Sequence, residues 1–238
     1  MCGILKEKKV VGAINKKSIH ITLSLLLFSG AVSFIDAFVK PDYFAKIPVK
    51  IVFFLIMPML FFVIYKEDFK EFKSLFSFKK GGFVKSLLLA LGVYGIIVGA
   101  FFLTQGVIDY SNVTTSLTSG MGITADNFIY VAVYISLMNS FLEEFFFRGF
   151  GFITLKKYSS RKFAYIFSSV MFAFYHAGML WGMFGALGLL LIFIGLLAGG
   201  TIFCYLNESS ENIYPSWFVH MFANFAINTV GFILFGMI

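Results

Sequence analysis

Residues 128–150 read FIYVAVYISLMNSFLEEFFFRGF. The stretch is long and apolar enough to cross a bilayer as a helix, because about 20 such residues span the hydrocarbon core. It nevertheless carries Glu143, Glu144 and Arg148 within its length. Ionisable side chains are costly at membrane depth, so they indicate a functional site inside a helical bundle.

The rest of the chain has the same apolar character. Of its 238 residues, 59% are hydrophobic and only 13% are charged, whereas soluble domains carry about 25% charged residues. Further stretches of spanning length lie at roughly 18–39, 47–65, 86–105, 163–180, 182–206 and 214–236. We therefore predict an all-α fold, a polytopic transmembrane helical bundle of about seven spans with its active site within the membrane.

Basic residues are distributed unevenly between the two ends of the predicted spans. The net charge is +7, which in a chain this apolar favours loops facing anionic cytoplasmic lipid over nucleic-acid binding. One side receives Lys6, Lys8, Lys9, Lys16, Lys17, Lys66, Lys70, Lys73, Lys79, Lys80, Lys85, Lys156, Lys157, Arg161 and Lys162. The other receives Lys40, Lys46 and Lys50, and a long loop at 106–127 that has no basic residue. The pattern predicts a cell-membrane protein with a cytoplasmic N-terminus and an outside C-terminus.

Three further features concern the N-terminal helix, the basic segment at 66–85 and the two cysteines. The apolar run after Lys17 is long for a signal-peptide core and lacks a small-x-small cleavage site, so we expect a retained helix. Residues 66–85 mix lysine with phenylalanine and are expected to lie along the cytoplasmic surface, or to form a solvated loop. Cys2 and Cys204 are isolated, which argues against a disulfide framework or a cysteine metal site.

Two glycine pairs have the spacing of helix-packing motifs. Gly95 and Gly99 lie four residues apart in one predicted span, and Gly195 and Gly199 do so in another. Small residues at this spacing let helix backbones approach closely. We expect a packing role for these glycines and assign them no chemistry.

The acidic pair in 128–150 is suited to acid–base chemistry. Glu144 and Arg148 are four residues apart, so they share one helix face and are expected to form an ion pair. Glu143 points about 100° away and has no cation on its own helix. A buried carboxylate beside a second one suits a general base that activates water. The alternative is a purely structural role, in which Glu144 and Arg148 form an ion pair and Glu143 forms a hydrogen bond to a neighbouring group or extends toward the membrane surface.

Two later spans contain histidine. His176 ends the sequence Phe172-Ala-Phe-Tyr-His176, and His220 precedes Asn224 and Asn228 on a polar stripe of the last span. Each of these groups taken singly also fits a packing residue that hydrogen-bonds a neighbouring helix.

Together, these side chains form the set that amide hydrolysis requires. The set is Glu143, Glu144, Arg148, His176, His220 and Asn224. Helices of a bundle can bring such groups together, and they supply a base, an orienting ion pair and donors for an oxyanion. Glu143, His176 and His220 can alternatively ligate zinc with one position open for water. Since no serine or cysteine lies in a nucleophile motif, direct attack by water is favoured over an acyl-enzyme.

The order of these motifs resembles a known family. Glu-Glu-x-x-x-Arg at 143–148, Phe-x-x-x-His at 172–176 and His-x-x-x-Asn at 220–224 resemble the CPBP intramembrane proteases, a group that includes CAAX prenyl proteases and bacteriocin-processing proteins and is also called the Abi family. The resemblance covers 128–236. It implies a catalytic core of about four spans at 128–238. Residues 1–127 match only by being hydrophobic, and their apolar pattern predicts about three N-terminal spans with basic segments in the same integral membrane domain.

The resemblance also implies a role for each residue. Glu143 activates water, and Glu144 and Arg148 support it. His176 binds water or a metal, and His220 and Asn224 polarise the scissile carbonyl. The family is labelled as metalloproteases, but a metal-free glutamate mechanism is favoured here and zinc is left open.

One geometric conflict arises from the predicted boundaries. Glu143 lies about 10 Å from the cytoplasmic end of its span and His176 about 20 Å from the same side, although both must reach one depth. Either residues 150–165 form a cytoplasmic helix or turn, which the basic residues there favour, or the site lies deeper in the membrane.

Three functions are weighed on this pattern. The leading one is an endopeptidase that acts on a membrane-associated peptide or protein, with membrane lipid as its other partner. The second is a non-catalytic bacteriocin self-immunity or scaffold protein, which need not keep the complete polar set. The third is a transporter, which predicts polar residues along a path through the membrane; the first three spans and the sixth look plain, which favours a local site.

Overall fold

The computed structural model describes residues 15–78 and 83–238, and within these ranges the chain is helical with no strand. The α-helices are α1 (Lys16–Phe34), α2 (Tyr43–Ile51), α3 (Met57–Ile64), α4 (Phe69–Leu75), α5 (Phe83–Thr104), α6 (Ser111–Met121), α7 (Ala125–Tyr134), α8 (Ser140–Glu143), α9 (Leu155–Tyr158), α10 (Arg161–Met179), α11 (Ala186–Ser210) and α12 (Tyr214–Leu234). A 3-10 turn, η3, covers Lys66–Asp68. Four wider π-helical segments are η1 (Ile35–Val39), η2 (Val52–Ile56), η4 (Ile135–Asn139) and η5 (Glu144–Thr154).

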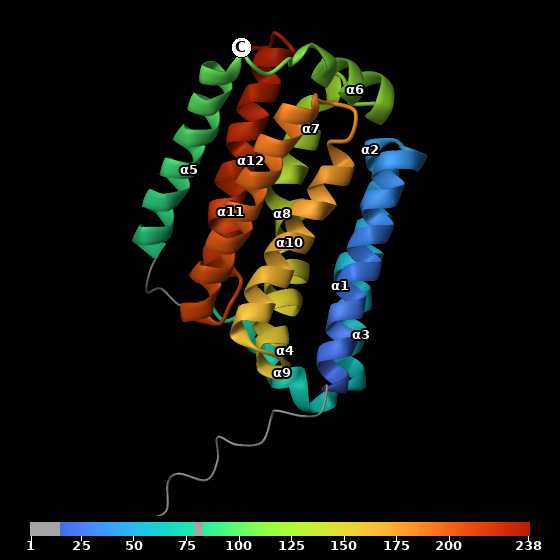
Figure 1. Cartoon of the computed structure of the whole chain (residues 1–238), viewed down its shortest axis with the longest axis vertical. Coiled ribbons are helices and arrows are strands. Elements are labelled where there is room, and N and C mark those ends of the chain that lie inside the picture. The colour runs from blue at the N-terminus through green and yellow to red at the C-terminus, as the bar shows by residue number, and fades with distance from the viewer. Residues whose placement is uncertain (1–14, 79–82) are drawn as a thin grey trace, which may run out of the picture.

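Six continuous helical stretches are long and apolar enough to cross a membrane: Lys16–Val39, Tyr43–Ile64, Val84–Thr104, Ala125–Tyr158, Ala186–Ser210 and Tyr214–Leu234. The predicted span at 163–180 forms as α10, which runs along the bundle beside the others (Figure 1). It is absent from the apolar set because its sequence begins with Arg161 and Lys162 and contains serines and His176. The prediction of a helical membrane bundle is confirmed.

The helix that carries the acidic pair is longer than predicted. It continues without a break from Ala125 to Tyr158, and α10 begins at Arg161. The preferred expectation that 150–165 form a separate cytoplasmic helix or turn is therefore wrong. The number of residues from Glu143 to Tyr158 equals the number from Arg161 to His176, so the two side chains reach the same depth. The site lies deeper than the apolar pattern alone indicated.

Aromatic side chains fill the core around this long helix. The ring of Phe54 stacks on Phe146 at 4.4 Å between centroids, and it meets Phe147 and Tyr175 edge to face at 5.5 and 5.2 Å. All four side chains are fully buried. Edge-to-face and offset contacts are the favoured aromatic geometries, so this cluster fixes η2 against η5 and α10.

The glycine pairs do not make the close helix contacts that were predicted. A methyl group added at Gly95, Gly99, Gly195 or Gly199 would meet no atom within 4 Å. The close approach occurs instead at Gly200, where the added carbon would lie 3.2 Å from Cα of Ser169. The spacing marks a face that can approach a helix, but the bundle packs α10 and α11 through the neighbouring residue.

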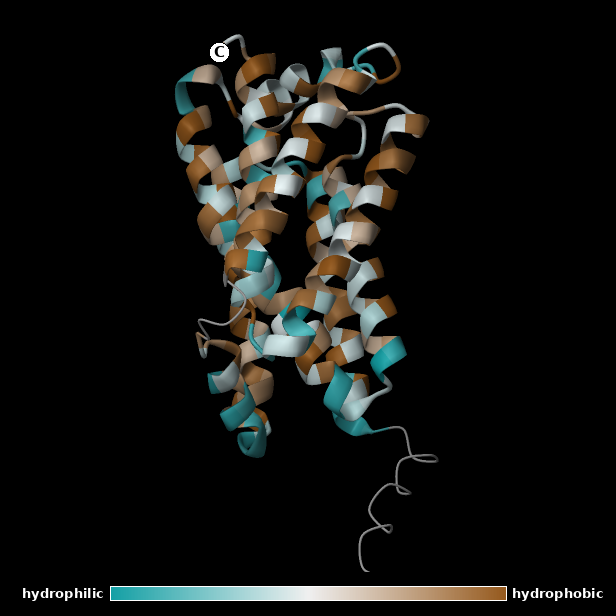
Figure 2. Cartoon of the chain, turned by 90° about the vertical axis from the view of Figure 1, so that its left-hand side faces the viewer, coloured by the Kyte–Doolittle hydropathy of each residue, from teal (hydrophilic) through white to brown (hydrophobic). Residues whose placement is uncertain are grey.

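The bundle end at which α1 begins is tied by ion pairs. Nζ of Lys17 lies 2.7 Å from carboxylate oxygens of both Glu67 and Asp68, and Lys157 lies 3.1 Å from Glu71. Figure 2 shows hydrophilic residues at this end and mostly hydrophobic ones along the helices. Lys6, Lys8, Lys9, Lys79, Lys80 and Cys2 lie outside the described residues, and the orientation of the termini stays a prediction.

Two predicted loops contain helices. Within 66–78, α4 buries Leu75, whose carbonyl accepts a 3.1 Å hydrogen bond from the backbone N–H of Ile213. This segment is therefore packed against the protein and is not a plain solvated loop. The long loop at 106–127 contains α6, which covers the other end of the bundle (Figure 1).

Candidate active site

The polar residues of the predicted site converge where α8 meets η5. Glu143 ends α8 and Glu144 begins η5, while η4 precedes α8. A π-helical segment is wider than an α-helix, and such segments occur often at functional sites because they redirect side chains and loosen the backbone ladder. Both carboxylates are at most 1% exposed.

The two oxygens of Glu143 have different surroundings. Oε1 accepts hydrogen bonds from Nδ2 of Asn139 at 2.7 Å and from the hydroxyl of Tyr175 at 3.0 Å. Oε2 has no hydrogen-bond partner among the described residues. It faces Nε2 of His176 at 3.4 Å and Nε2 of His220 at 3.7 Å. One oxygen is thus anchored and the other is directed at both imidazoles.

The hydrogen bond made by Nδ1 of each histidine determines how its ring is oriented. Nδ1 of His176 lies 2.9 Å from the carbonyl oxygen of Phe172, which can only accept, so Nδ1 is the donor. Nδ1 of His220 lies 2.9 Å from Oε1 of Glu144 and donates to that carboxylate in the same way. Both Nε2 atoms are left to face Glu143.

Glu144 holds His220 as well as Arg148. Its Oε2 accepts a 2.5 Å hydrogen bond from the hydroxyl of Ser216, and Nε of Arg148 lies 3.5 Å from the same oxygen. The predicted Glu144–Arg148 ion pair therefore forms. The guanidinium also lies over aromatic rings, 4.0 Å from the centroid of Phe172 and 4.9 Å from that of Phe203. Cation–π contacts of this kind stabilise a desolvated arginine.

Asn224 and Asn228 link α12 to the helix before the acidic pair. Nδ2 of Asn224 donates to the carbonyl of Ile135 at 3.1 Å, and Nδ2 of Asn228 donates to the carbonyl of Ala132 at 3.1 Å. The polar stripe therefore joins helices, as the packing interpretation expects. No contact places Asn224 on Glu143 in the described part of the chain, and its predicted role toward a substrate carbonyl stays a prediction.

Sequence reasoning missed the residues that lie behind Glu143. The charge pattern assigns Lys46 and Lys50 to the outer side of the membrane, but both are 4% exposed within the bundle. Nζ of Lys50 donates to Oδ1 of Asn139 at 3.0 Å, and Lys46 pairs with buried Asp36 at 2.9 Å. The first two spans are therefore not plain. The available signal was that Lys50 lies inside the predicted span 47–65.

Ser216 and Asn207 were also missed. Nδ2 of Asn207 donates to Oγ of Ser216 at 2.6 Å, and both side chains are fully buried. Asn207 lies on α11, one residue beyond the predicted span 182–206, so the observed helix carries a buried polar group linked to the site. Neither residue belongs to a charged motif, so the sequence offered no strong signal for them.

The predicted zinc ligands have suitable chemistry, and their donor atoms face one another at 3.4 and 3.7 Å from Oε2 of Glu143. The free oxygen of Glu143 and the two Nε2 atoms are lone-pair donors of the kind zinc prefers. Within residues 15–78 and 83–238, however, no group of three or more histidine, cysteine, aspartate or glutamate side chains is placed to hold a metal ion. Zinc at these residues therefore stays a prediction.

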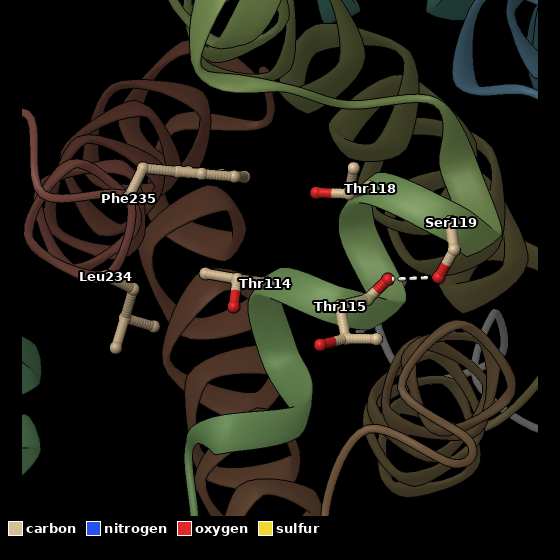
Figure 3. Close-up of a pocket in the computed structure, with 6 residues that line it drawn as sticks. All are labelled: Thr114, Thr115, Thr118, Ser119, Leu234 and Phe235. Atoms are coloured by element: carbon tan, nitrogen blue, oxygen red, sulfur yellow. Dashed lines mark hydrogen bonds between the residues drawn. The ribbon is translucent and has the colours of Figure 1, made fainter.

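The protein surface has a hollow that is separate from the acid–histidine cluster. It has a volume of about 470 Å³ and is lined by Thr114, Thr115, Thr118, Ser119, Leu234 and Phe235 (Figure 3). These residues belong to α6 and the end of α12, and none of them contacts the acidic pair. The most exposed member of the acid–histidine cluster is His176, whose side chain is 12% exposed.

Residues 125–226 match the family described as type II CAAX prenyl endopeptidase Rce1-like. The match covers the acidic pair, both histidines and Asn224, and it confirms the resemblance to CPBP and CAAX proteases that the motifs indicated. Comparison with curated proteins and with solved structures gives no match.

Proposed function

Residues 125–226 carry an Rce1-like CAAX endopeptidase domain, and from that premise we propose that Glu143 activates the water that hydrolyses a peptide bond within the membrane. The observation that supports this most is the asymmetry of Glu143. Oε1 is fixed by Asn139 and Tyr175, while Oε2 is free of hydrogen-bond partners in the described chain and faces two imidazoles. A general base needs this combination of a fixed carboxylate and a free oxygen.

The proposed reaction begins with a water molecule beside Oε2 of Glu143 and Nε2 of His176. Because Nδ1 of His176 donates to a carbonyl, its Nε2 accepts one hydrogen of the water, and Glu143 removes the other as a proton. The water oxygen attacks the carbonyl carbon, and the electron pair of the C=O double bond moves to oxygen. When the tetrahedral intermediate collapses, the C–N bond breaks and Glu143 returns the proton to the leaving nitrogen.

The oxyanion of that intermediate requires donors. His220, when protonated, presents N–H from Nε2 while its Nδ1 remains on Glu144. The negative charge of Glu144 stabilises this imidazolium, and Ser216 and Arg148 hold the carboxylate in place. Asn224 lies one turn further along α12 and supplies a second donor if its amide leaves the carbonyl of Ile135.

The substrate class follows from the family and from burial. The carboxylates are buried in a bundle of helices long and apolar enough to cross a membrane, which favours a substrate that is itself associated with the membrane. We infer a membrane-associated peptide or protein, with a prenylated C-terminal CAAX peptide as the first candidate. By the positive-inside rule, the basic end at which α1 begins faces the cytoplasm.

The test is cleavage of membrane-tethered peptides, including a prenylated CAAX peptide, by the purified chain in liposomes. Wild type is compared with Glu143→Gln, and we expect the variant to lose about 10²- to 10⁴-fold in kcat, the range of general-base catalysis. Arg161→Gln, far from the site, is the matched control. Activity that survives Glu143→Gln contradicts the proposal. If a chelator abolishes wild-type activity and zinc restores it, the metal-free mechanism is wrong and a zinc mechanism takes its place.

A second candidate function, proton transfer across the membrane, is favoured by one observation. Buried polar side chains continue on both sides of the acidic pair, through Asn207, Ser216, Glu144, His220, Glu143, Asn139 and Lys50. Liposomes loaded with a pH-sensitive dye test this. Decay of an imposed pH gradient in wild type but not in Glu143→Gln identifies transport, and an unchanged gradient excludes it.

A further inference from the structure

Lys50 is a buried cation directly behind the acidic pair. It is the second-last residue of α2, a helix far from Glu143 in the sequence, and it is 4% exposed. Nζ donates to Oδ1 of Asn139 at 3.0 Å and lies over the ring of Tyr175, 5.4 Å from its centroid. Asn139 and Tyr175 are the two donors to Oε1 of Glu143. Lys50 therefore contacts both side chains that anchor this oxygen.

The chemistry of the three groups determines the orientation of Asn139. A lysine ammonium can only donate hydrogen bonds and a carboxylate can only accept them. A carboxamide between the two must turn its oxygen to Lys50 and its N–H₂ to Glu143, as the structure has it. Without the ammonium, only Glu143 selects this orientation, and the buried amide oxygen loses the donor that holds Asn139 from the side of α2.

The buried charged side chains around Glu143 form pairs of opposite charge. Lys46 is matched by Asp36 at 2.9 Å, and Arg148 is matched by Glu144 at 3.5 Å. Among residues 15–78 and 83–238, Lys50 has no carboxylate within ion-pair distance. The remaining acid is Glu143, which Lys50 reaches through Asn139. An isolated buried charge is very costly, so each of these two groups is the counter-charge of the other.

From this geometry we infer that Lys50 is a positioning residue for Glu143, acting through Asn139 to hold Oε1 so that Oε2 points at the imidazoles. The inference rests on the proposed function of Glu143. It assigns to α2, which lies outside the Rce1-like segment, a direct part in arranging the base. Lys50 touches neither the reacting atoms nor the histidines, so its removal alters the efficiency of the base rather than the binding of peptide.

The kinetic test compares Lys50→Met, Asn139→Leu and the double variant in the liposome cleavage assay. Removing an outer partner of a functional group typically costs 10- to 100-fold, so we expect Lys50→Met to lower kcat by about this factor with KM changed less than about threefold. Because Lys50 acts through Asn139, the double variant should lose about as much as the larger single variant. The inference is overturned if the loss in kcat of the double variant equals the product of the two single losses. It is also overturned if Lys50→Met keeps kcat within about threefold of wild type.

The matched control removes the neighbouring buried cation together with its acid. Asp36→Asn with Lys46→Met deletes the ion pair between η1 and α2, whose lysine lies one turn from Lys50. We expect kcat to stay within about threefold of wild type, because Asn139 accepts its hydrogen bond from Lys50 and not from Lys46. An equal loss in this control identifies a general effect of buried charge and overturns the specific role of Lys50.

A thermal measurement separates this inference from the proposed function. The midpoint of unfolding in detergent is compared for wild type, Lys50→Met, Glu143→Gln and the double variant. If Lys50 and Glu143 are counter-charges, Lys50→Met lowers the midpoint in wild type and lowers it less, or raises it, in the Glu143→Gln background. Equal shifts in both backgrounds refute the pairing, whether or not any peptide is cleaved. Cleavage that survives Glu143→Gln refutes the proposed function instead.

Discussion

Two regions of the molecule use the same residue types in opposite ways. At the end where α1 begins, the ion pairs of lysine and arginine include partly exposed side chains, such as that of Glu67, which is 67% exposed. In the bundle interior, Glu143 and Glu144 are surrounded by donors and fully enclosed. Exposed pairs contribute roughly 0–1 kcal/mol, whereas breaking a buried pair costs about 3–5 kcal/mol. Burial, rather than charge type, therefore separates the region that carries chemistry from the region that ties helices together.

The largest effect in this comparison is expected for Glu144→Gln. It leaves the Arg148 guanidinium buried without its carboxylate and replaces the charged acceptor of Nδ1 of His220 by a neutral amide. We expect a loss of about 3–5 kcal/mol of stability and a drop in kcat of roughly 10- to 100-fold. Thermal unfolding in detergent and the peptide assay measure the two effects.

The double variant Glu144→Gln with Arg148→Met separates these two losses. Removing both charges together should restore most of the stability, because replacing a buried pair by apolar groups is often neutral. Activity should stay low, since Nδ1 of His220 still lacks a negatively charged acceptor. Restored activity would show that Glu144 serves only to neutralise Arg148.

A smaller effect is expected for Tyr175→Phe. The change removes one of two donors to Oε1 of Glu143 and keeps the aromatic ring that packs on Phe54. We expect a kcat reduced about tenfold, since a hydrogen bond to a charged group contributes roughly 1.5 kcal/mol or more. Steady-state kinetics measure this, and an unchanged kcat would mean that Asn139 alone fixes the carboxylate.

Asn228→Leu should affect stability more than chemistry. Its amide joins α12 to α7 and η4 through Ala132 and Ser136, at 3.1 and 3.0 Å. Interhelical hydrogen bonds in membranes contribute about 0.6 kcal/mol on average, so we expect a lower unfolding midpoint with kcat within about twofold of wild type. A large loss of kcat without a change in the midpoint would assign Asn228 to the reaction instead.

The smallest effect is expected at the exposed end. The hydrogen bond from Lys17 lowers the pKa of the Glu67 carboxyl below its ordinary value. A lowered folded-state pKa stabilises the protein above the ordinary glutamate pKa of about 4.3 and loses that contribution as the pH falls through the folded value. Glu67→Gln should therefore shift the unfolding midpoint slightly at pH 7 and not at all once wild-type Glu67 is protonated. A shift larger than that of Asn228→Leu would contradict the contrast between the two regions.

The local patterns of the sequence predicted much of the fold and part of the site. Apolar length predicted the helices, and the spacing of Glu144 and Arg148 predicted their ion pair, because both depend on residues close together in the chain. The depth of Glu143 was misplaced, since the long helix continues through 150–158 with its basic residues paired at the bundle end. The roles of Lys50 and Asn139 could not be predicted, because their contact joins residues 89 positions apart.

By itself, the sequence determined that this chain forms apolar helices and that three spans of its C-terminal half carry Glu143, Glu144, Arg148, His176, His220 and Asn224. Only the tertiary structure decided which atom of each side chain meets which partner. Helical spacing defines the face on which a residue lies, but the contacts between helices depend on how complete faces pack. Packing placed Asn139 between Lys50 and Glu143, placed Glu144 on His220, and left one oxygen of Glu143 directed at two imidazoles.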